Sequence, residues 1–122
     1  MNNPGDFVMT LLNARTAAHV AHLSVSGLGA LSAHQALAAF YEGIVDIADR
    51  FAEGYMGCEG ELIKFTGSSF KLSKDHIQMI KDVKAKIQES RAECDDYPFL
   101  QQIMDDGIEL CAVTLYKLTQ LK

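Results

Sequence analysis

Apolar residues recur every three or four positions along four stretches of this 122-residue chain. That spacing is typical of one face of an α-helix, and glycine-, serine- or proline-bearing segments separate the stretches. Helices are expected over about residues 6–23, 33–56, 74–93 and 97–120, after a disordered lead at 1–5. Four amphipathic helices in a chain of this size predict an all-α fold, a single-domain antiparallel four-helix bundle covering residues 1–122.

Helix-capping and helix-breaking residues predict where these helices begin and end. The expected N-caps are Asp6, Ser32 and Ser73. Three glycines are expected to end the second helix: Gly54, Gly57 and Gly60. The apolar positions of this second helix cover so wide a stripe, almost all round it, that contacts on more than one side are expected. Gly107, inside the fourth helix, has two interpretations: it marks a close helix approach, or it is merely tolerated there.

Composition narrows the function classes. The net charge of −5 and the pI near 5.2 argue against a protein that binds the phosphate backbone of DNA. The three cysteines are widely spaced, which suggests a reducing, cytoplasmic location and buried apolar roles. No apolar run approaches the roughly 20 residues that span a bilayer. These features predict a protein that interacts with neither nucleic acid nor membrane.

Four candidate metal ligands flank or lie within the second predicted helix: His22, His34, Asp49 and Glu53. Asp49 and Glu53 are four residues apart and share one helix face. His22 is expected to lie near His34, because the turn between them is short. His34 precedes Asp49 by fifteen residues, which is roughly 22 Å along one helix. Because metal–ligand bonds are about 2 Å long, His34 and Asp49 of one chain cannot bind the same ion. A twofold dimer with antiparallel second helices would bring the histidines of each copy to the carboxylates of the other.

Simpler interpretations remain open for each of these residues. A histidine in an apolar stripe is commonly a packing residue, and this applies to His19, His22 and His34. The Asp49–Glu53 pair is open to a solvated role, paired with Arg50 or Arg15. A third alternative is a zinc-binding helical module that uses His19 and His22, three residues apart.

The order His22, eleven residues, His34, fourteen residues, Asp49, three residues, Glu53 resembles the ferroxidase pattern of the miniferritins. These form the DNA-protection-during-starvation (Dps) family. His22 precedes a short glycine-bearing turn, and His34 stands where the family's second histidine opens helix two. The stretch Asp49-Arg50-Phe51-Ala52-Glu53 looks like the family's D-x-x-A-E-R signature. The resemblance covers about residues 7–56.

This resemblance implies a ferritin-like bundle that binds Fe(II) between twofold-related subunits. His22 and His34 would be ligands from one chain, and Asp49 and Glu53 ligands from the other. Peroxide or oxygen would oxidise the iron, and a hollow homo-oligomer, at least a dimer, would retain the ferric product for iron storage or oxidative-stress protection. Zinc and manganese are chemically reasonable substitutes for iron at such ligands.

The chain also departs from the miniferritin pattern. Ala38 stands where the family usually has another carboxylate, which indicates a weakened site and leaves both a mononuclear and a dinuclear site open. Leu23 and Ser26 replace the usual Trp and Arg of the turn, and there is no lysine-rich tail, so DNA coating is not carried over. Two hypotheses follow: an iron-binding, ferroxidase-type protein, or a degenerate ferritin-like bundle with a structural or protein-interaction role and no turnover.

Overall fold

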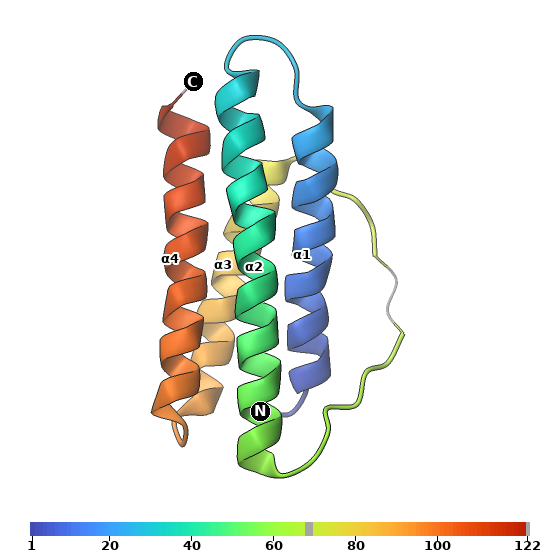
Figure 1. Ribbon diagram of the computed structural model, residues 1–122, viewed down its shortest axis with the longest axis vertical. Helices are drawn as coiled ribbons and strands as arrows, with labels where there is room; N and C mark the ends of the chain where they lie inside the picture. The colour runs from blue at the N-terminus through green and yellow to red at the C-terminus, as the bar shows by residue number, and fades with distance from the viewer. Residues whose placement is uncertain (68–69, 122) are drawn as a thin grey trace.

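The computed structural model describes residues 1–67 and 70–121, and every regular element in them is helical. Four α-helices, with one short 3₁₀ segment, account for this structure: α1 (Pro4–Ser24), α2 (Ala30–Glu59), α3 (His76–Arg91), the 3₁₀ segment (Ala92–Cys94) and α4 (Pro98–Gln120). Figure 1 shows the helices side by side along one long axis. The expected all-α four-helix bundle is confirmed. None of the described helices is long and apolar enough to cross a membrane.

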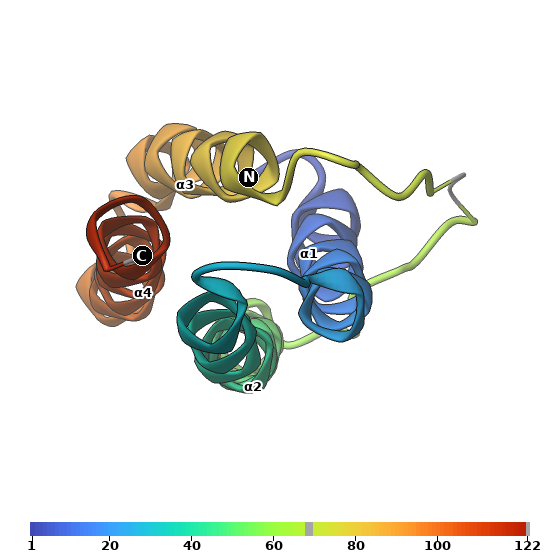
Figure 2. The ribbon, with the colours of Figure 1, turned by 90° about the horizontal axis from the view of Figure 1, so that it is seen from above.

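The helices occupy the four corners of the bundle, and each packs against two neighbours. Helix α1 contacts α2 and α3, while α4 contacts the same two helices from the opposite corner (Figure 2). The colour course in Figure 1 shows that α1 and α4 run one way and α2 and α3 run the other way. Every packed pair is therefore antiparallel, as the sequence predicts.

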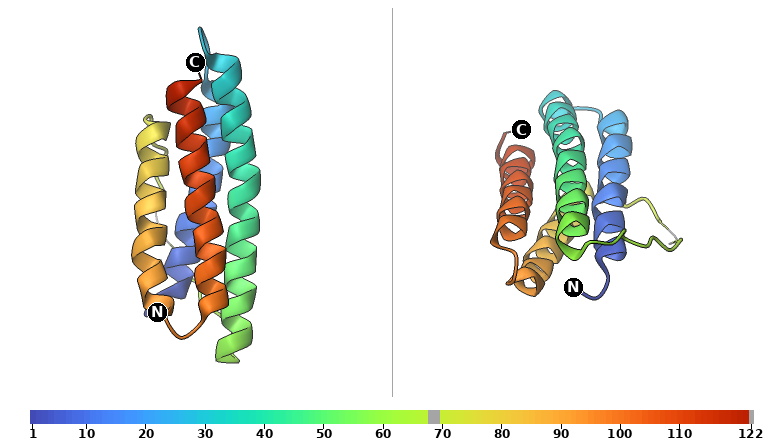
Figure 3. Two further views of the ribbon diagram at one scale, coloured as in Figure 1. Left: turned by 90° about the vertical axis from the view of Figure 1, so that its left-hand side faces the viewer. Right: turned by 60° about the horizontal axis from the view of Figure 1, so that its bottom comes forward.

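One long crossover connects the two halves of the bundle. Because α2 and α3 point in the same direction, the chain must return along the length of the bundle between them. It does so outside α1, where the segment after Glu59 swings away from the helices (Figures 2 and 3). Ile63 is the buried side chain of residues 61–67 and attaches this segment to the core.

Large apolar side chains from all four helices fill the core. The largest of the fully buried ones are Phe7, Leu11, Leu37, Phe40, Ile44, Phe51, Ile80, Ile87, Leu100 and Met104. Of the two interpretations of Gly107, the close helix approach is confirmed. A Cβ built there would lie 3.2 Å from Ile47 of α2 and from Ile87 of α3, so three helices meet at this point.

The predicted helix ends are correct to within three residues, but the residues that cap the helices differ from those predicted. Helix α1 begins at Pro4, inside the predicted disordered lead, because proline is favoured in the first helical turn. The N-caps are Asn3, Gly29 and Asp75, in place of Asp6, Ser32 and Ser73. Of these three residues, only Asp75 caps its helix with its side chain, which accepts a hydrogen bond from the Gln78 backbone N–H.

Helix α2 continues through two of the glycines that were expected to end it. Gly60, whose φ is 72°, adopts the left-handed conformation that ends the helix. Gly54 instead packs against the side chains of Phe99 and Leu100 on α4. Tertiary packing thus overrides the weak helix propensity of glycine at this position.

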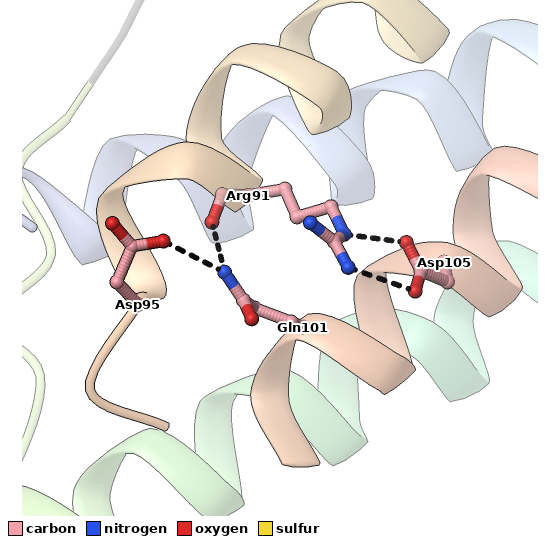
Figure 4. A network of polar contacts seen from close by, with 4 residues as sticks. All are labelled: Arg91, Asp95, Gln101 and Asp105. Carbon is pink, nitrogen blue, oxygen red and sulfur yellow. Dashed lines mark hydrogen bonds and ion pairs between the residues drawn. The ribbon is translucent and has the colours of Figure 1, made fainter. Parts of the chain in front are cut away.

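A polar network fastens the α3–α4 connection (Figure 4). The Arg91 guanidinium donates to both carboxylate oxygens of Asp105, at 2.6 and 3.2 Å. The Gln101 amide nitrogen donates to the Arg91 carbonyl oxygen and to Asp95. These contacts tie the end of α3 to the start of α4.

Candidate metal centre

His22 and His34 lie against each other at the turn between α1 and α2. Their ring centroids are 3.6 Å apart and the ring planes differ by 19°. The Nδ1 of His22 lies 2.7 Å from the carbonyl oxygen of His34, and the Nδ1 of His34 lies 2.8 Å from the carbonyl oxygen of His22. The sequence prediction that these two histidines are near each other is confirmed.

These reciprocal hydrogen bonds determine the tautomer of each ring. A carbonyl oxygen can only accept, so each Nδ1 must carry the hydrogen. In the neutral ring Nε2 then holds the lone pair that a metal ion needs. Metal-binding histidines commonly donate their other ring N–H to a backbone carbonyl, which orients the ring. A metal ion bound by either ring would therefore be bound through Nε2.

His19 and Tyr41 extend this pair into a four-ring cluster. The Tyr41 ring stacks on His19, with centroids 4.2 Å apart and planes within 14°. Tyr41 also meets His22 edge-on at 5.4 Å. His19 and His22 have centroids 6.0 Å apart. We call these four residues (His19, His22, His34 and Tyr41) the histidine–tyrosine cluster. The sequence pattern alone does not single out Tyr41, because its contacts depend on how α1 and α2 pair.

Asp49 and Glu53 lie on the solvent-exposed face of α2, towards its far end. Two further acidic residues of α2, Glu42 and Asp46, are exposed on the same side, and we call the four together the acidic stripe. The expectation that α2 is apolar nearly all round is therefore wrong. Its buried positions face α1 and α4, whereas its outer face carries charge.

Arg50 does not neutralise the Asp49–Glu53 pair. Its guanidinium lies 3.0 Å from Asp106 of α4 and 3.5 Å from Asp46. The alternative in which Arg50 pairs with Asp49 and Glu53 is thus not the arrangement found. In the part of the chain that the structure describes, no three His, Cys, Asp or Glu side chains converge as a metal-holding group. One chain brings the two histidines into contact and places Asp49 and Glu53 on one exposed face of α2, but it does not join the two pairs.

The cysteines lie outside this region. Cys94 and Cys111 are buried, as expected, and burial raises the pKa of the Cys111 thiol to about 12. Cys58 is exposed in the last turn of α2, beyond the core, so the expectation of burial is wrong for this residue.

Comparison with known protein families identifies a matching family. Residues 29–118, more than half of the chain, match a family described as a family of unknown function (DUF5856). The chain belongs to the DUF5856 family. The matched region contains three residues of the DUF5856 protein's candidate site, His34, Asp49 and Glu53, and begins after His22. No curated protein and no solved structure matches this DUF5856 chain.

Proposed function

We propose that this protein binds Fe(II) as a substrate at two equivalent sites, each shared between the α2 helices of a twofold dimer. In each site His22 and His34 of one copy meet Asp49 and Glu53 of the other. Imidazole with hard carboxylate oxygens suits iron, and also zinc or manganese. Peroxide or oxygen then oxidises the bound iron, and a homo-oligomer retains the ferric product for iron storage or oxidative-stress protection.

The observation that carries this proposal is the reciprocal hydrogen bonding of His22 and His34. Packing alone would be satisfied by two apolar side chains at this turn. The structure instead contains two imidazoles whose Nδ1 atoms are committed to backbone carbonyls. That commitment leaves a lone pair on each Nε2, and metal-binding histidines typically donate their other ring N–H in this way.

The shape of α2 supports a shared site. His34 and Asp49 lie roughly 22 Å apart on one continuous helix, so a single chain cannot bring them to one ion. In an antiparallel pair of α2 helices, a twofold axis near Glu42 and Gly43 brings His34 close to Asp49 and Glu53 of the other copy. Because a twofold interface is isologous, this creates two identical sites.

Exposed apolar residues at the two ends of α2 support the same pairing. Leu28, just before α2, and Leu31, in its first turn, are 107% and 70% exposed. Leu62 and Phe65, just after its end, are 81% and 52% exposed. Antiparallel copies would place each end beside the opposite end of the other copy and would cover both groups.

The chain topology adds a separate line of support. A single long crossover between two helical hairpins is the connection found in ferritin-like bundles. Helices α2 and α3 are joined in this way (Figure 1). Simple up-and-down bundles have short connections throughout.

Subunit complementation tests whether the sites are shared. Chains with His34→Ala and chains with Asp49→Ala should each lose Fe(II) binding, and mixed dimers should regain one of the two sites. Asp82→Ala, on α3, serves as the matched carboxylate control. If mixtures shown to exchange subunits recover no binding, the shared site is excluded.

Iron oxidation separates this function from the second candidate, a degenerate bundle with a structural or interaction role. Ala38 favours that second candidate, because the miniferritins usually have a carboxylate at this position, one turn after His34. Aerobic or peroxide-driven formation of ferric absorbance should be faster in the native chain than in a His22→Ala/His34→Ala variant. Equal rates would leave only the structural role.

A further inference from the structure

We infer that the groove between α1 and α3 binds a single-chain amphipathic anion, an alkyl carboxylate. Its carboxylate head lies at Lys71 and Lys86, and its apolar tail runs past Ala17 towards Val25. This inference goes beyond the proposed function and does not depend on iron, because no residue of α2 is among the described residues that line the groove. We call this region the α1–α3 groove.

Two adjoining cavities form the α1–α3 groove. The first has a volume of about 370 Å³ and the second a volume of about 480 Å³. Ala17 and Ser73 line both cavities, so the two meet there. Sites for small ligands commonly measure roughly 300–1,000 Å³. Along α1 the groove extends from Thr10 to Ser24, fourteen residues or roughly 21 Å, which suits an extended chain.

Three parts of the chain border the groove. Helix α1 contributes Ala14 and Ala17, and α3 contributes Met79 and Val83. The end of the crossover, residues 70–74, reaches α3 along this side of the bundle (Figure 2). An α-helix with its side chains is about 10–12 Å across. A partner helix would therefore have to displace the end of the crossover, whereas an alkyl chain would lie beside it.

Apolar side chains at the groove remain accessible to solvent. Phe70 lines the first cavity and is 39% exposed, and Leu72 lines the second and is 54% exposed. Val20, also at the second cavity, is 37% exposed. Covering apolar surface is favourable roughly in proportion to its area. An alkyl chain in the groove would cover all three side chains.

The charged groups at the first cavity match a single negative charge. Lys71 and Lys86 line this cavity, and neither forms an ion pair within the described part of the chain. Asp82 lines it as well, and its carboxylate accepts a hydrogen bond from the Gln78 side chain at 2.8 Å. Two cations and one anion leave one positive charge, which favours a carboxylate over a dianionic phosphate monoester. The Asn13 amide, also at this cavity, supplies a further hydrogen-bond donor.

The positive charge of this region stands out against an acidic chain. Residues 71–86 contain five lysines and two aspartates, whereas the whole chain has a net charge of −5. Lys74 lines the second cavity, where none of the described lining residues is acidic. Charge of one sign around a cleft raises the local concentration of the opposite ion. Lysines beside an apolar cavity thus select an amphipathic anion over a neutral or cationic chain.

Isothermal titration calorimetry with dodecanoate, kept below its micelle concentration, tests the proposal. The native chain should bind one dodecanoate. Dodecyltrimethylammonium has the same chain with a positive head, and acetate has the carboxylate without the chain. Both should bind at least about tenfold more weakly. Neither the head nor the tail alone then accounts for the affinity.

Two changes to the groove locate the bound molecule. Ala17→Leu places a larger side chain where the cavities meet and should abolish binding. Lys71→Gln/Lys86→Gln should weaken dodecanoate binding about tenfold. The matched control is Lys81→Gln/Lys84→Gln, which removes two lysines of α3 that line neither cavity and should leave the affinity unchanged. Circular dichroism checks the fold of each variant, and the two lysine variants decide the result if Ala17→Leu does not fold.

Three results would overturn the proposal: no saturable binding of dodecanoate, equal binding of dodecyltrimethylammonium, or equal weakening by the two lysine double variants. Sedimentation with vesicles of phosphatidylcholine and phosphatidylglycerol distinguishes a free chain from a membrane surface. Association with these vesicles in the absence of dodecanoate binding would overturn the groove site in favour of an anionic membrane surface. None of these results bears on Fe(II) binding at α2, which is tested separately.

Discussion

His22 and His34 each donate an Nδ1–H to the backbone carbonyl oxygen of the other, so the end of α1 and the start of α2 hold each other in position. The same contact aligns the two rings in a stack. One pair of side chains therefore closes the turn and orients two candidate ligands. Substitutions at either position must be interpreted with both effects in mind.

The His22–His34 stack predicts non-additive losses of stability. His22→Ala and His34→Ala each remove one hydrogen bond and the shared stack, whereas the double variant loses the stack only once. The sum of the single effects should therefore exceed the double effect by about 0.5–1.5 kcal/mol. Urea unfolding of the metal-free protein measures this difference. Full additivity would mean that the stack contributes nothing to stability.

The acidic stripe predicts that repulsion between the carboxylates of the two copies weakens association of the proposed dimer when metal is absent. The twofold axis near Glu42 would bring the two Glu42 carboxylates towards each other. Glu42→Gln should strengthen association, measured by sedimentation in the presence of a chelator, by about 1 kcal/mol at low salt. Asp82→Asn on α3 is the charge-matched control. No gain from Glu42→Gln would contradict this register of the two α2 helices.

Two glycines predict opposite effects of the same substitution. Gly5 is buried in α1, where an added Cβ would clash with the Lys64 carbonyl oxygen of the crossover, so Gly5→Ala should destabilise the fold by about 1–3 kcal/mol. Gly57 lies inside α2 with open space around it, so Gly57→Ala should stabilise by about 1 kcal/mol through helix propensity. Thermal unfolding of both variants gives the comparison. A stabilising Gly5→Ala would show that the crossover is free to move away from α1.

Cys111 predicts a loss of stability at alkaline pH. Burial raises the pKa of its thiol from an ordinary value of 9.0 to about 12. Below pH 9 both the folded and the unfolded chain keep the thiol protonated. Between pH 9 and 12 the unfolded thiol ionises first, so the free energy of unfolding falls, by up to about 1.4 kcal/mol per pH unit.

Comparison of variants isolates this contribution from lysine and tyrosine titration. The decline in the free energy of unfolding above pH 9 should be shallower in Cys111→Ala. It should be unchanged in Cys58→Ala, because Cys58 is exposed. An equal decline in all three proteins would show that the Cys111 thiol does not contribute.

The bundle could be predicted from the sequence, because the spacing of apolar residues indicates which face of a helix is buried. That spacing does not depend on which helix packs against the face. Helix ends were less predictable, since Ser32 and Gly54 follow local preferences that packing overrides. Gly54 stays helical because Phe99 and Leu100 of α4 pack on it, and no local pattern reveals that contact. The same limit applies to the site. Spacing indicated that His22 and His34 are neighbours, but the contacts of Tyr41 and the engagement of Arg50 with Asp106 depend on how separate helices pair.

The outer path of the crossover gives the chain a modular construction. Helices α1 and α2 form one hairpin, and α3 and α4 form another, each closed by its own short turn. Only the span outside α1 joins them covalently, and Ile63 is the side chain by which residues 61–67 enter the core. A protease that cuts at residues 61–67 would therefore leave two fragments whose interlocking core continues to hold them together. The candidate ligands would all remain on the N-terminal fragment.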